Sequence, residues 1–92
     1  MTSSNPTKRR WNKSEIRAAR KIELAPLLAR RGIRLQPLRE GNFCVVDYDD
    51  LLIKESYWRW PSKNIEGNAI DFFVLVEGMS FADAMALLAQ AH

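Results

Sequence analysis

Apolar and polar positions along the chain predict helices at both ends and short strands between them. "EIRAARKIE" follows the candidate cap residues Asn12 and Ser14, which predicts a helix. "APLLARR" stops before Gly32 and predicts either a second short helix or the end of one helix kinked at Pro26. "IRLQPL" and "NFCVVDY" flank a turn at residues 40–42 and predict a β-hairpin. "SYWRWP" predicts a third short strand that its proline ends, and "SKNIEG" predicts a loop.

The last 25 residues predict two capped helices. Asn68 can cap a helix that Gly78 ends, and "AIDFFVLV" is apolar nearly all round, so this helix is expected to be buried. Ser80 and Asp83 form a second helix start, followed by apolar residues at helical spacing. The predicted core consists of Val45, Phe72, Phe73, Val76, Phe81, Met85 and Leu88.

These elements predict a single small α+β domain: a three-stranded antiparallel sheet flanked by an N-terminal helix and two C-terminal helices. The 92 residues, 47% of them hydrophobic, suit one modest core. One cysteine and one histidine exclude an internal disulfide and an ordinary four-ligand zinc site. The basic N-terminus lacks a following apolar run, and "FFVLV" is too short to cross a bilayer, so a cytoplasmic location without a membrane partner is expected.

Charge is divided unevenly between the two parts of the chain. Residues 1–39 contain eleven Lys or Arg and two acids, whereas residues 40–92 contain three Lys or Arg and nine acids. This division indicates a basic surface for a polyanion, with nucleic acid as the first candidate and an anionic membrane as the second. A solvated tail without a partner is the alternative. We interpret residues 1–13 as a flexible basic arm and residues 14–92 as the folded module.

Aromatic residues lie beside cations at two places, "KRRWNK" and "YWRW". A strand would place Tyr57 and Arg59 on one face and Trp58 and Trp60 on the other, so one pair can enter the core while the other stacks on bases. The predicted nucleic-acid-binding residues are Lys8, Arg9, Arg10, Trp11, Lys13, Arg34, Tyr57, Trp58 and Arg59.

The sequence offers no catalytic constellation. "DYDD" contains carboxylates that Mg²⁺ favours, but no second acidic motif or phosphate-binding loop accompanies it, which favours a solvated turn. His92 has no partner nucleophile, and Cys44 lies in an apolar stretch typical of an inert core thiol. We therefore expect a binding protein without enzymatic activity, cofactor or metal.

Two segments of the chain carry a family resemblance. "EGNAIDFF", followed by "FADAMALLAQAH", resembles the end of the zinc-binding domain of bacterial DNA primases. "IELAPLLARRGIRLQPLREGNFCVV" is similar in spacing to the helix, strand and turn that precede the first metal ligands of that family. The resemblance covers roughly residues 21–92 and implies a zinc-ribbon-like sheet.

The zinc ligands of that family are not retained in this chain. By spacing, the family's Cys-x-x-His and Cys-x-x-Cys pairs fall on Asp47, Asp50, Trp60 and Lys63. The resemblance therefore implies a metal-free variant. We expect packing of Trp60, with a weaker Asp50–Lys63 ion pair, to replace metal coordination at this joint.

By resemblance, the chain is expected to be a non-catalytic DNA-binding module. It would bind single-stranded DNA as a replication or priming accessory of a plasmid, phage or other mobile element. The alternative is a protein-interaction adaptor or decoy that docks on a primase, helicase or other replication protein. A sequence-specific duplex binder is a third possibility, disfavoured because no clear recognition helix is present.

Overall fold

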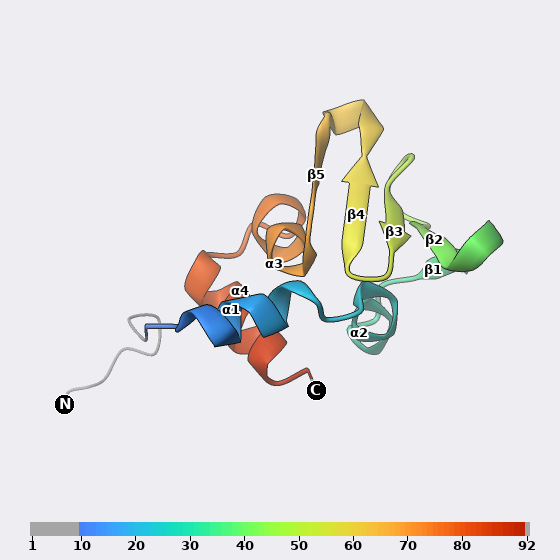
Figure 1. Cartoon of the computed structure of the whole chain (residues 1–92). Helices are drawn as coiled ribbons and strands as arrows, with labels where there is room; N and C mark the ends of the chain where they lie inside the picture. Colours follow the sequence, from blue (N-terminus) through green and yellow to red (C-terminus); the bar gives the residue numbers. More distant parts are fainter. Residues whose placement is uncertain (1–9, 92) are drawn as a thin grey trace.

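The computed structural model describes residues 10–91, and Figure 1 shows a β-sheet beside and above a group of helices. The strands are β1 (Leu35–Pro37), β2 (Asn42–Val45), β3 (Leu52–Lys54), β4 (Tyr57–Trp60) and β5 (Ile65–Gly67). They lie in the order β1-β2-β3-β4-β5, and every neighbouring pair is antiparallel. The sheet is therefore a five-stranded meander in which each strand pairs with its neighbours in sequence.

The prediction of a three-stranded sheet was wrong, because it omitted β3 and β5. Each of these strands has three residues, which is too short for alternation of apolar and polar positions to be recognised. Their extended conformation depends on pairing, since β3 hydrogen-bonds to β2 and β4, and β5 hydrogen-bonds to β4. The predicted loop "SKNIEG" contains the end of a short 3-10 turn, Pro61–Lys63 (η3), and then β5.

The N-terminal part forms two short helices instead of one kinked helix. Helix α1 (Lys13–Arg20) begins after Asn12, which exchanges hydrogen bonds with Glu15 in a capping box. Helix α2 (Leu24–Arg30) follows after a three-residue break. Gly32 comes after α2 with φ +85°, a left-handed conformation that glycine adopts without steric cost.

The C-terminal helices begin at the predicted caps. Asn68 and Asp71 form a capping box at helix α3 (Ala69–Asp71). The helix continues as a π-helical turn over Phe72–Val76 (η4). The Ser80 hydroxyl oxygen accepts the backbone N–H of Asp83 at the start of helix α4 (Phe81–Ala89). α4 packs against α1, α3 and η4, so the first and last helices of the described chain lie in contact.

The core lies between the sheet and the helices. Trp58 and Phe72 meet edge to face with ring centroids 5.8 Å apart, and Phe73 packs against Phe72 at 5.3 Å. Of the predicted core residues, Val45, Phe72, Phe73, Met85 and Leu88 are buried.

Two expectations about the C-terminal core were wrong. Phe81 is 46% exposed. Helical side chains point toward the N-terminus, and Phe81 is the first residue of α4, so its ring is directed past the helix end. The α3–η4 segment is not buried all round, because Leu75 is 52% exposed.

The sheet has one packed face and one open face. Ile53 and Trp58 are paired in register and buried, and α2 packs against β1 and β3. Neighbouring residues on the strands point to the opposite side, where Leu52, Arg59 and Glu66 form a row across β3, β4 and β5. This open face is accessible to a partner.

Candidate nucleic-acid interface

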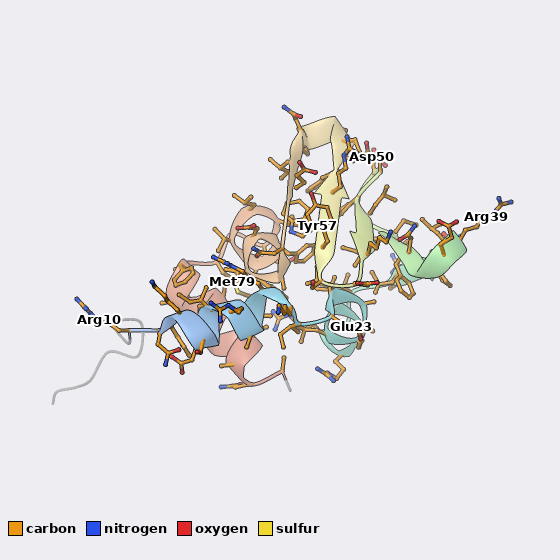
Figure 2. All side chains as sticks on the ribbon, viewed as in Figure 1. Arg10, Glu23, Arg39, Asp50, Tyr57 and Met79 are labelled. Atoms are coloured by element: carbon orange, nitrogen blue, oxygen red, sulfur yellow. The ribbon has the colours of Figure 1, made fainter. Side chains whose placement is uncertain are left out.

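Helix α1 carries its cations on the side away from the core. Lys13, Arg17 and Arg20 are exposed, as is Lys21 at the helix end. At 3.6 residues per turn, these four positions fall within an arc of about 100°. Arg10 is also exposed and precedes the same helix (Figure 2). The name "cationic face" is used below for Arg10, Lys13, Arg17, Arg20 and Lys21.

The opposite side of α1 is fixed to the core. Ala19 is buried and Trp11 is half-buried, and both line a cleft of about 320 Å³ between α1 and α4 together with Met85 and Leu88. Trp11, a predicted nucleic-acid contact, is packed against the core cluster. This packing helps to fix the start of α1.

Helix stability does not account for the whole cationic face. Arg17 and Arg20 in the last turn favour the helix dipole, but Lys13 at the first position opposes it. Within residues 10–91, no side chain of the cationic face takes part in a hydrogen bond or an ion pair; Lys21, for example, bonds through its backbone N–H alone. A row of solvated cations on a rigid element is suited to the phosphates of a polyanion.

The open face of the sheet holds the second group of predicted residues. Tyr57 is 47% exposed and Arg59 is exposed, and they line a shallow hollow of about 170 Å³ with Leu52 and Lys54. The Tyr57 hydroxyl donates a hydrogen bond to Glu66 Oε1 at 2.7 Å. This hydrogen bond, more than desolvation or the charge of Glu66, raises the pKa of Tyr57 above its ordinary value.

Trp58 lies on the packed face of the sheet, so the face assignment left open by the sequence is settled. Its ring is 1% exposed, and its indole N–H donates to the backbone oxygen of Asn68 at 2.8 Å. A side chain in this position cannot stack on a base without unfolding the core. Tyr57 and Arg59 are therefore the pair available to a ligand.

Arg34 is paired with an acid. Its guanidinium lies 2.7 Å from Asp47 Oδ1, with side-chain exposures of 71% and 59%. An exposed pair of this kind contributes about 0 to 1 kcal/mol to stability, so it does little for the fold. It does offset the charge that Arg34 would present to a phosphate.

The loops after β2 and after β4 meet at one end of the sheet, and the positions that resemble lost zinc ligands lie in or beside this joint. The Trp60 indole N–H donates to Asp49 O at 2.7 Å, and the Tyr48 ring packs 5.1 Å from the Trp60 ring. Asp50 accepts both the backbone N–H and the hydroxyl of Ser62, at 2.9 and 2.8 Å.

The expected Asp50–Lys63 ion pair is absent from the part of the chain that the structure describes. Asp50 uses both carboxylate oxygens on Ser62, while the Lys63 ammonium lies 5.6 Å from the centre of the Trp60 ring. The half-buried Trp60 thus contacts residues of both loops that form the joint. Among residues 10–91, no three His, Cys, Asp or Glu side chains are grouped so that they could hold a metal ion.

The predicted residues therefore divide into two separate surfaces. Figure 2 shows Arg10 and Tyr57 well apart. Lys8, Arg9 and His92 lie outside the described residues. The prediction missed Arg17, Arg20 and Lys21, although their spacing from Lys13 gave the signal of one helix face.

Comparison with known proteins finds little similarity. No protein-family model matches the chain, and no solved structure is significantly similar to it. No helix formed by residues 10–91 has the length and apolar character needed to cross a membrane. An uncharacterized protein of Bacillus anthracis, pXO2-78, is 29% identical to this chain over 82 residues. The match covers 87% of this chain and 24% of that protein, so the chain spans about a quarter of the length of the curated relative it matches.

Proposed function

We propose that the protein is a non-catalytic module that binds nucleic acid, with single-stranded DNA as the favoured ligand. The observation that carries this proposal is the cationic face of α1. It presents several exposed cations that have no acidic partner among residues 10–91. Each phosphate that these side chains neutralise releases counterions, which makes binding favourable at low salt.

The geometry of α1 supports a contact with a phosphate backbone. Lys13, Arg17 and Arg20 span about 10 Å along the helix axis at 1.5 Å per residue. A nucleic-acid strand places several phosphates within this distance. Because Trp11 and Ala19 anchor the opposite side of α1, the cations are presented from a fixed element. Such a contact reads the backbone, so binding is expected to tolerate many sequences.

The preference for single strands rests on the open sheet face. The exposed ring of Tyr57 can stack on an unpaired base, and Arg59 beside it can contact the adjoining phosphate. Bases in a duplex are stacked on each other and do not offer this contact. The hydrogen bond from Tyr57 to Glu66 orients the phenol but places a carboxylate beside it, so the sheet is the weaker of the two contacts.

The role as a replication or priming accessory of a mobile element rests on resemblance. The segment "GNAIDF" and the C-terminal helix are similar to the zinc-binding domain of bacterial primases, which engages single-stranded template. The relative pXO2-78 is several times longer than its matching segment, which is consistent with a module that also occurs within larger proteins.

A titration of fluorescently labelled oligonucleotides tests the proposal. Single strands and duplexes of about 20 nucleotides, each in several sequences, are titrated at about 50 and about 200 mM salt and followed by anisotropy. We expect single strands to bind more tightly than duplexes, with similar affinity for each sequence and a steep loss at the higher salt.

Two outcomes would contradict the proposal. Absence of binding at the lower salt for both ligands would exclude the nucleic-acid function and favour docking on a replication protein. Tighter binding to one duplex sequence than to any single strand would instead indicate a sequence-specific duplex binder.

A further inference from the structure

A hollow on the described surface lies between α2 and the β1–β2 hairpin. It has a volume of about 580 Å³, within the range of ligand pockets in proteins. Its walls are mainly apolar and come from Ala25, Pro26, Ala29, Leu35, Gly41 and Phe43, with Glu23 and Glu55 at its edge. We call this feature the α2 groove.

The two acids of the α2 groove come from chain segments that are hydrogen-bonded to each other. A backbone hydrogen bond of 2.9 Å from Leu24 N to Glu55 O joins the start of α2 to the β3–β4 turn. Glu23 occupies the cap position of α2 but makes no side-chain cap hydrogen bond. Neither carboxylate has a hydrogen bond or ion pair within residues 10–91. An occupant that combines an apolar group with a cation would satisfy both the walls and the edge.

The β1–β2 turn of the same chain has this combination of groups. Leu38 is 43% exposed, and Arg39 is exposed and extends away from the body of the molecule in Figure 2. A hydrogen bond of 2.7 Å from Leu38 N to Asn42 O closes the turn. Arg39 has no ion pair within the described residues. Leu38 and Arg39 are called the hairpin tip below.

We propose that two copies of this chain pair by placing the hairpin tip of each in the α2 groove of the other. Leu38 would pack on Phe43 and Ala29, and Arg39 would reach Glu23 and Glu55. Gly41 belongs to both the turn and the groove wall, so the tip and the groove are adjacent. One two-fold axis beside Gly41 therefore satisfies both sites at once and closes the assembly as a dimer.

Glu40 is the one acid in the turn, and it would bring a like charge toward the partner's carboxylates. The dimer is therefore expected to be weak and to tighten when Glu40 is replaced by Gln. Sedimentation equilibrium between about 5 and about 500 µM protein should show a monomer–dimer equilibrium without larger species.

Charge reversal tests the contact on both sides. Arg39→Glu alone, and Glu23→Lys with Glu55→Lys, should each raise the dimer Kd by about tenfold or more. Combining all three substitutions restores opposite charges and should recover most of the affinity. Leu38→Asp tests the apolar contact independently. Asp49→Lys with Glu77→Lys makes the same charge change elsewhere and should have little effect. Circular dichroism melting confirms that each variant folds.

Three results would overturn the proposal: a parent that stays monomeric at all concentrations, assemblies larger than a dimer, or a groove variant that dimerises like the parent. Failure of the triple variant to recover would exclude the contact of Arg39 with the groove acids. Because the assay contains no nucleic acid, its failure leaves the proposed nucleic-acid function untouched.

Discussion

Helix α1 and the open face of the sheet contain similar side chains but differ in how those side chains are partnered. On α1, the cations are solvated and point away from a buried apolar stripe. Around the sheet, Tyr57 is bound to Glu66 and Arg34 is bound to Asp47. The availability of a charged or aromatic group thus depends on its neighbours as well as on its residue type.

The comparison assigns different roles to the two regions. The cationic face has charges to offer a polyanion without first breaking an ion pair within residues 10–91. The sheet offers one exposed phenol and Arg59, with an acid beside them. We therefore expect α1 to supply most of the affinity and the sheet to supply the preference for unpaired bases.

The largest expected effect is the loss of stability on replacing Trp58, the buried residue of strand β4. Trp58→Ala should reduce the free energy of unfolding by about 3 to 5 kcal/mol, because it leaves a cavity beside Phe72 and removes the indole hydrogen bond to the Asn68 oxygen. Denaturant unfolding measures this loss, and Trp58→Phe should retain more stability. An unchanged midpoint with weakened DNA binding would instead place Trp58 in the interface.

A substitution in the joint between the β2–β3 and β4–β5 loops should lower the free energy of unfolding less than Trp58→Ala does. Asp50→Ala removes two hydrogen bonds to Ser62 at a position with φ +47°, and should cost about 1 to 2 kcal/mol of unfolding free energy. Asp50→Asn keeps an acceptor oxygen and tolerates the left-handed conformation, so thermal melting should show a smaller loss. Equal stability of Asp50→Ala and the parent would contradict this role of Asp50.

Removing the exposed phenol tests the sheet contact. Tyr57→Ala should weaken binding of single strands by about 1 kcal/mol, the lower end for a stacked base, and leave duplex binding unchanged. Tyr57→Phe keeps the ring and serves as the control. If Tyr57→Ala weakens duplex and single strand equally, the sheet does not distinguish unpaired bases.

The hydrogen bond to Glu66 should be detectable as a pH effect. It raises the pKa of Tyr57 above the ordinary value of 10.0, so the folded state favours the protonated phenol. The stabilisation is therefore complete below pH 10.0 and is lost as pH rises through the raised pKa. The difference between ultraviolet titrations of the parent and Tyr57→Phe should give a midpoint above 10.0, and Glu66→Gln should lower that midpoint.

Local signals predicted much of the fold. The caps at Asn12, Asn68 and Ser80 could be identified because each acts on residues three positions away. Strands β3 and β5 could not, since a three-residue strand is stabilised mainly by its partners in the sheet. Phe81 kept helical spacing with Met85, but the sequence does not show that the side chain of the first residue of α4 lies outside the core.

The candidate site was less accessible to prediction than the fold. The alternation of β4 separated Tyr57 from Trp58, but pairing in the sheet decided which of them is buried. The excess of cations near the N-terminus was visible in composition. The pairing of Arg34 with Asp47 joins residues 13 positions apart through the β1–β2 hairpin, which composition cannot show.

The central claim is that the unpartnered cations of α1 carry nucleic-acid binding, and the salt dependence of binding tests it most directly. Replacing Lys13, Arg17 and Arg20 by Ala keeps good helix formers on α1. The control replaces three partnered cations by Ala: Arg30, which donates to Ala91 O, Arg34, which pairs with Asp47, and Lys63, which lies over Trp60.

The measured quantity is the slope of log affinity against log salt for a single-stranded oligonucleotide. At about 0.7 per neutralised phosphate, the α1 variant should lose about 2 from the slope, while the control variant should keep a slope close to that of the parent. A control variant that loses as much slope as the α1 variant, or an α1 variant that binds like the parent at every salt concentration, would contradict the account.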